Sequence, residues 1–130
     1  MKILVAYEGS DLSEKILEFV KKRAKLFNAE VYLVTSKIGG REVPRQEFVT
    51  AEKDLEYAEN LLKDDGISCE THLLVRGLYP GEDVVQFAQE KEFDEIIVGV
   101  KKRSKVGKFL LGSTAQYVIL EAPCPVVSVK

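Results

Sequence analysis

The residues best suited to chemistry lie in one stretch of the sequence, from Val98 to Thr114. A short apolar run ends there at Gly99, and the segment Gly112-Ser113-Thr114 opens a helical pattern. Between them stands a cationic cluster made of Lys101, Lys102, Arg103, Lys105 and Lys108. Unpaired N–H groups at a helix start, the positive end of the helix dipole and nearby cations together attract an anion. The stretch therefore predicts a phosphate-binding site.

Two plainer interpretations of the same stretch stay open. The cationic cluster could be a solvated surface that only keeps the protein soluble. Ser113 or Thr114 could serve only as the cap of the helix that follows. Neither interpretation requires a ligand.

Composition limits the classes of partner. The chain has 130 residues, 45% apolar and 31% charged, which is typical of a soluble globular domain. A formal net charge of -2 gives no general signal for nucleic acid, so the cationic cluster favours a small ligand. The N-terminal residues do not resemble a signal peptide and no apolar run has the length of a membrane span. We expect a cytoplasmic protein in which Cys69 and Cys124 are buried and unpaired.

Apolar runs alternate with helical patterns along the whole chain. They predict five strands and four helices, with strands at 2–7, 31–34, 67–75, 95–99 and 126–129 and helices at 12–27, 48–64, from 83 onward and 112–121. This alternation is typical of a doubly wound parallel sheet covered by helices on both faces. No linker divides the chain, which predicts a single domain over residues 1–130. Ligands of such sheets bind beyond the carboxyl ends of the strands, here near Glu8 and Gly99.

Several catalytic motifs are absent from the sequence. A P-loop is excluded because Lys102 replaces its first glycine and Phe109 stands where Ser or Thr must reach magnesium. There is no dinucleotide fingerprint and no nucleophile elbow. A phosphoacceptor aspartate is missing at the end of the third strand, where the chain has Val75 and Arg76, and His72 has no partner at ligand spacing. The sequence thus predicts no catalytic residues and no metal site.

Four segments carry a family resemblance by their order and spacing. They are Ile3-Leu4-Val5-Ala6-Tyr7-Glu8-Gly9-Ser10, Ile96-Ile97-Val98-Gly99, Leu110-Leu111-Gly112-Ser113-Thr114-Ala115 and Pro123-Cys124-Pro125-Val126-Val127. With them the chain resembles the universal stress protein family from end to end. The resemblance implies a flavodoxin-like (adenine nucleotide alpha hydrolase-like) α/β fold with strand order 3-2-1-4-5. It also implies a homodimer joined through the last strand, with Val126, Val127 and Val129 at its interface.

The resemblance implies a regulatory role in the stress response. In one branch of the family this role includes binding ATP or AMP, with Mg²⁺ only alongside ATP and without efficient turnover. The predicted protein is therefore not an enzyme. The alternative is a dimeric interaction module from the branch that does not bind ATP.

The ATP-binding branch has a glycine, two residues, a second glycine, nine residues, and then Gly-Ser or Gly-Thr. Gly99 and Gly112-Ser113 match this pattern, whereas Lys102 replaces the second glycine and Glu8 replaces the family's aspartate. A side chain at 102 hinders backbone contact with a phosphate but adds a cation. A tyrosine at position 7 either stacks on a base or packs in the core. The resemblance implies nucleotide binding by Ala6, Tyr7, Glu8, Ser36, Val98, Gly99, Val100, Lys101, Lys102, Gly112, Ser113 and Thr114.

Overall fold

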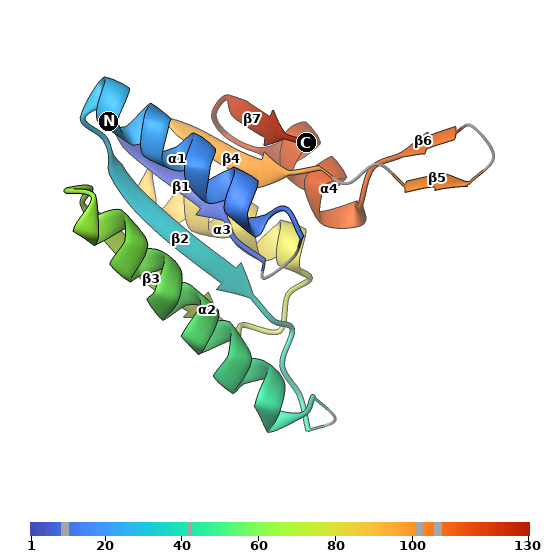
Figure 1. The fold of residues 1–130 in the computed structure, drawn as a ribbon. Coiled ribbons are helices and arrows are strands. Elements are labelled where there is room, and N and C mark those ends of the chain that lie inside the picture. Colours follow the sequence, from blue (N-terminus) through green and yellow to red (C-terminus); the bar gives the residue numbers. More distant parts are fainter. Residues whose placement is uncertain (9–10, 42, 101–102, 106–107) are drawn as a thin grey trace.

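A five-stranded parallel sheet forms the centre of the molecule in a computed structural model, which describes residues 1–8, 11–41, 43–100, 103–105 and 108–130. The side chains of residues 103–105 and 108–110 are not described. The sheet order is β3-β2-β1-β4-β7 (Figure 1). Its strands are β1 (Lys2–Ala6), β2 (Glu30–Ser36), β3 (Cys69–Leu74), β4 (Glu95–Gly99) and β7 (Val126–Val129). The predicted order 3-2-1-4-5 is confirmed, with β7 as the fifth strand of the sheet.

The two central strands are apolar because both of their faces are covered. In β1, Ile3, Leu4 and Val5 are fully buried, as are Ile96 and Ile97 in β4. These strands pair in parallel with Ile3 opposite Glu95 and Ala6 opposite Val98. Parallel strands that are buried on both faces have continuous apolar sequences, so these two strands could be predicted from the sequence.

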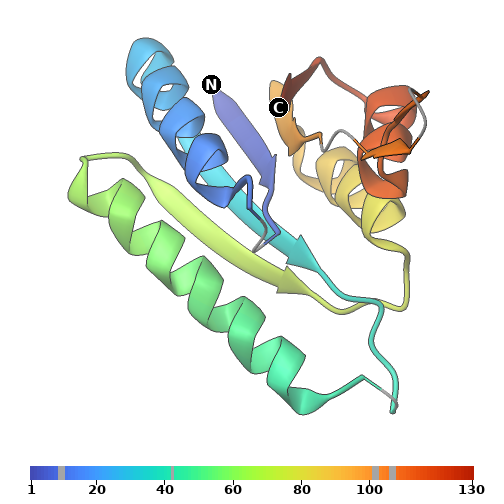
Figure 2. The ribbon, with the colours of Figure 1, turned by 45° about the vertical axis from the view of Figure 1, so that its right-hand side comes forward.

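Two helices cover each face of the sheet within the described residues (Figure 2). On one face lie α1 (Ser13–Phe27) and α2 (Arg45–Asp64), and on the other lie α3 (Pro80–Lys91) and α4 (Ser113–Glu121). Helix α2 begins before the predicted position 48 and ends at Asp64, two residues before Gly66, which has a φ of 77°. A glycine reaches that left-handed conformation without steric cost.

The predicted basic loop contains regular structure. Its backbone forms an antiparallel pair, β5 (Arg103–Lys105) and β6 (Lys108–Leu110), with Arg103 opposite Leu110. The pair projects away from the sheet (Figure 1). Lys101 and Lys102 lie outside the described residues, and so does the prediction that they take part in nucleotide binding.

Candidate functional site

The carboxyl ends of β1 and β4 open onto a cavity. β1 pairs with β2 on one side and with β4 on the other, so the chain winds in opposite directions from this point. Helix α1 borders the cavity on one face of the sheet and α4 on the other. Its volume is about 230 Å³, and it is lined by Ala6, Glu8, Leu12, Ile16, Val98, Gly99, Gly112, Ser113, Thr114 and Ala115. The structure thus brings together the ends of two strands and the start of α4, as the sequence predicted.

Two glycines of this cavity differ in what surrounds them. A β-carbon at Gly99 would lie 2.8 Å from Ile16 Cδ1, so any side chain there must displace the end of the Ile16 side chain. A β-carbon at Gly112 would have no heavy atom within 4 Å, apart from its chain neighbours. The backbone of Gly112 has a φ of -62°, which any residue adopts. Nothing within the described protein therefore demands glycine at position 112.

The start of α4 is open toward the cavity. Gly112 is the N-cap residue and provides no side-chain cap, so Ser113 and Thr114 are the first helical residues. The alternative in which Ser113 or Thr114 caps this helix is wrong. The first N–H groups of a helix have no partner within it, and they lie at the positive end of its dipole. Within the described part of the chain these donors have no side-chain cap, and two hydroxyl groups lie beside them in the cavity lining.

A second cavity lies on the other side of Glu8. Its volume is about 710 Å³, and it is lined by Glu8, Thr35, Ser36, Lys37, Ile38, Val43, Gln46, Glu47, Thr50, Ala51, Asp54 and Pro80. The Glu8 side chain is exposed, and its backbone carbonyl accepts a hydrogen bond of 2.9 Å from the Ser13 hydroxyl. Glu8 lines both cavities, so the two adjoin at this residue.

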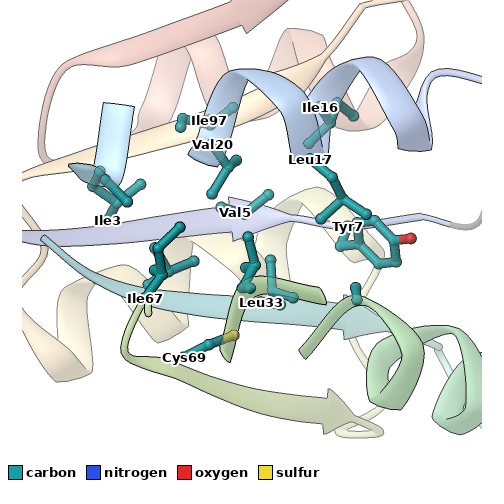
Figure 3. Close-up of a cluster of buried hydrophobic side chains, with 14 of the residues drawn as sticks. Ile3, Val5, Tyr7, Ile16, Leu17, Val20, Leu33, Ile67, Cys69 and Ile97 are labelled. Atoms are coloured by element: carbon teal, nitrogen blue, oxygen red, sulfur yellow. The ribbon is translucent and has the colours of Figure 1, made fainter. Parts of the chain in front are cut away.

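Two of the predicted site residues direct their side chains into the core. Tyr7 is 4% exposed and packs with Val5 and Leu17 between the sheet and α1 (Figure 3). Burial raises the pKa of its hydroxyl. Val100 is 3% exposed in the core on the opposite face, and its N–H donates to the Val129 carbonyl at 2.7 Å. The Tyr7 ring is therefore not available to stack on a base.

A polar network that the sequence did not reveal stands behind the second cavity. Asp83, in the first turn of α3, is fully buried. Its Oδ2 accepts a hydrogen bond from the Ser36 hydroxyl at 2.7 Å, and its Oδ1 accepts one from Arg76 Nε at 2.6 Å. Arg76 Nη1 also donates to both carboxylate oxygens of Glu90 at 3.0 Å. Bonds from Gln86 and Arg76 lower the pKa of Glu90.

The sequence model of one known family, the universal stress protein family, matches residues 1–130. The chain belongs to the universal stress protein family. A relative from Methanocaldococcus jannaschii is 32% identical over 99% of this chain and 81% of its own length. A universal stress protein from Thermus aquaticus is 31% identical, covering 98% of this chain and 97% of its own.

Solved structures of universal stress proteins share the fold. One from Archaeoglobus fulgidus has a TM-score of 0.89 and 36% identity, covering 99% of this chain and 97% of its own. A structure of a universal stress protein from Archaeoglobus fulgidus in complex with dAMP has a TM-score of 0.82 and 32% identity, covering 99% of this chain and 96% of its own. The flavodoxin-like fold predicted from the sequence is confirmed.

The far edge of the sheet is formed by β7, where the universal stress protein resemblance predicts a dimer. Val126, Val127 and Val129 are half-buried, whereas Ser128 is exposed. The Pro125 carbonyl accepts a bond from Ile96 of β4, and the Val129 carbonyl accepts one from Val100, which follows β4. Because backbone groups alternate in direction along a parallel strand, those of Val126 and Ser128 face the open edge.

Other features of the described residues concern metals, membranes and thiols. Within the ranges that the structure describes, no three His, Cys, Asp or Glu side chains gather to hold a metal ion. Over the same ranges, no helix combines the length and apolar character needed to cross a bilayer. Cys69 is buried as predicted, whereas Cys124 is only half-buried, and neither forms a disulfide.

Proposed function

We propose that this universal stress protein binds an adenine nucleotide, ATP or AMP, at the carboxyl ends of β1 and β4 and acts as a stress-response regulator. The observation that carries the proposal is the open space at Gly112 beside the uncapped start of α4. An empty approach to unpaired N–H groups suits an anion held by the backbone. Residues 1–130 are proposed to form the single domain that does this.

The phosphates are assigned to the first cavity. Ser113 and Thr114 provide hydroxyl groups there, and the start of α4 provides N–H donors and the positive end of a dipole. In the sequence, Lys101 and Lys102 lie within the connection that leads from β4 toward α4. Cations placed there add attraction for a phosphate that the backbone alone would hold less tightly.

The adenosine is assigned to the region around Glu8 and the second cavity. Glu8 lines both cavities, and its carboxylate can accept hydrogen bonds from ribose hydroxyl groups. Ser36 contributes to the same lining from the end of β2. The related structure with dAMP, at 32% identity, supports a nucleoside monophosphate as ligand.

Binding without efficient turnover is part of the proposal. Among the described residues that line the first cavity, Glu8 is the only one with an ionisable side chain. Hydrolysis of a phosphoanhydride needs a positioned water and charge neutralisation, usually by Mg²⁺. Phosphate release from ATP above the buffer rate, lost on Ser113→Ala, would show that the protein is a hydrolase instead.

The experiment that tests binding compares two variants of one helix. Calorimetric titration with AMP and ATP is expected to give micromolar to millimolar affinity for the parent and for Gln116→Ala, whose side chain is exposed. Gly112→Val is expected to bind at least about tenfold more weakly, because its side chain occupies the approach to the N–H groups. Equal affinity of Gly112→Val and the parent would contradict the proposed mode of binding.

A dimeric interaction module is the second candidate function. The observation that favours it is the unpaired edge of β7, next to a helix α4 whose Ile119 and Leu120 are 40% and 70% exposed. Such an edge is commonly covered by a second copy of the same chain. This candidate requires that the parent shows no nucleotide binding and that Lys102→Gly gains it.

We also propose that the protein is cytoplasmic. We propose further that it forms a dimer whose interface contains Val126, Val127 and Val129. The two unpaired cysteines support a reducing compartment. The half-buried valines support association, because pairing of a second β7 strand would remove the remainder of their surface from water. Nucleic acid and membranes are not among the proposed partners.

A further inference from the structure

A buried carboxylate fixes the direction of the hydroxyl group of Ser36, a residue that lines the second cavity. Ser36 is the last residue of β2, and Asp83 lies 47 residues further along the chain, in the first turn of α3. The Ser36 hydroxyl and Asp83 Oδ2 are 2.7 Å apart, and Asp83 is fully buried. A hydroxyl has one proton to donate and lone pairs with which to accept. Its partner in the protein therefore decides what it can offer a ligand.

The proton of Ser36 is used inside the protein. Arg76 donates from Nε to Asp83 Oδ1 at 2.6 Å and from Nη2 to the Asp83 carbonyl at 3.2 Å. A guanidinium has donors only, and its charge pairs with the buried carboxylate, which then acts only as an acceptor. Ser36 must donate to Asp83. The Ser36 hydroxyl then has only lone pairs to offer a ligand.

The Thr35 hydroxyl and the Glu8 carboxylate, which lie next to Ser36 in the cavity lining, also offer a ligand only hydrogen-bond acceptors. The Thr35 hydroxyl donates to the Tyr7 carbonyl at 2.7 Å, and the Glu8 carboxylate has only acceptors when ionised. Side-chain donors also reach this cavity from Lys37, Gln46 and the Thr50 hydroxyl, which accepts a bond of 3.4 Å from Gln46 Nε2. Lys37 and Gln46 have long side chains that can turn toward or away from a ligand, and Thr50 lies across the cavity on α2, whereas the hydroxyls at the end of β2 are fixed by bonds to the protein.

We propose that Asp83, acting through Ser36, sets the selectivity of the second cavity in favour of a ligand group with N–H donors over a carbonyl at the same position. For a purine this means an exocyclic amine, as in adenine, over the 6-oxo group of hypoxanthine. The inference rests on the proposed function, because it assigns the base of the nucleotide to this cavity. Asp83 is a positioning residue and does not touch the ligand.

The substitution Asp83→Asn reverses the polarity of the contact with little change of shape. Arg76 has only donors, so the amide oxygen is held facing the guanidinium and the amide nitrogen faces Ser36. An amide nitrogen donates, so Ser36 then accepts and its proton turns toward the cavity. Ser36→Ala removes the contact without touching the buried ion pair. Glu90→Gln is the matched control, because Glu90 binds the same Arg76 but not Ser36.

The test is the ratio of the dissociation constants of IMP and AMP, measured by calorimetry at one ionic strength on variants whose melting curves show a folded protein. We expect the parent and Glu90→Gln to prefer AMP by about tenfold, the size expected when one buried hydrogen bond is mismatched. Ser36→Ala should lower the ratio toward one, and Asp83→Asn should lower it at least as far. A structural role for Asp83 would weaken both ligands equally and leave the ratio unchanged.

Each outcome decides the inference. A parent ratio near one, or ratios in Ser36→Ala and Asp83→Asn equal to that of the parent, overturns the selectivity role and leaves nucleotide binding intact. If Asp83→Asn does not fold, Ser36→Ala alone decides. Absence of AMP binding to the parent overturns the proposed function and this inference with it.

Discussion

A β-carbon at Gly99 would lie 2.8 Å from Ile16 Cδ1, whereas one at Gly112 would meet nothing within 4 Å, apart from its chain neighbours. Both glycines line the same cavity. One is thus small because α1 packs closely against β4, and the other faces open space. Packing within the protein accounts for the glycine at position 99, whereas the space at Gly112 is open to a ligand.

Gly99→Ala is expected to destabilise the protein and Gly112→Ala to leave stability nearly unchanged. The new methyl group at 99 must displace the end of the Ile16 side chain, which costs about 1 kcal/mol in a packed core. Urea unfolding of the two variants measures the difference. Equal losses of unfolding free energy would contradict the account of the cavity wall.

The ion pair between Arg23 and Glu95 joins a buried carboxylate to a guanidinium side chain that is 30% exposed. Glu95 is 4% exposed at the start of β4, and Arg23 Nη2 donates to its Oε2 at 2.8 Å. Arg23→Met should cost about 3 kcal/mol, because a buried carboxylate is left without its partner. Adding Glu95→Leu should recover most of that loss. A double-mutant cycle by chemical denaturation measures the coupling, and additive losses would argue against it.

Stability should fall in alkaline solution because of Cys69. Burial raises the pKa of its thiol to about 12, from an ordinary value of 9.0. Between these pH values the unfolded chain loses the proton and the native protein keeps it, so the unfolding free energy decreases as pH rises. One proton corresponds to about 1.4 kcal/mol per pH unit. Thermal melts from pH 8 to 11 should show a shallower decline for Cys69→Ala, and parallel curves would exclude this cause.

Ser128→Pro should produce a monomer. The backbone N–H of Ser128 faces the open edge of β7, so proline removes a donor for a second chain without removing a bond to β4. Sedimentation equilibrium is expected to show a dimer for the parent and for Ser128→Ala. A proline variant that still sediments as a dimer would place the interface elsewhere.

The fold could be predicted because its most buried strands are continuous apolar runs, such as Ile3 to Ala6 and Ile96 to Val98. Strand alternation also predicts the position of Tyr7, since residues 3, 5 and 7 share the face that meets α1. By the same rule the Tyr7 ring lies in the core, where it cannot stack on a base. Phe27, the last residue of α1, is 46% exposed beside the Arg23 guanidinium.

The network behind the second cavity could not be found in the sequence. An aspartate in a first helical turn usually faces solvent or complements the helix dipole, and Asp83 has that position. Its burial depends on Ser36 from β2 and Arg76 from the connection after β3, and only the folded sheet brings these residues together. The one available signal is that Asp83 adjoins Val84 and Val85 on the inner side of α3.

The central claim is that this universal stress protein binds an adenine nucleotide at the cavity between the ends of β1 and β4. Its most direct test is a calorimetric titration of the purified parent protein with AMP, extended to millimolar ligand. We predict a saturating binding heat for the parent. Gly112→Val should bind AMP at least about tenfold more weakly, with the same melting temperature as the parent. No heat with either AMP or ATP at millimolar concentration would contradict it.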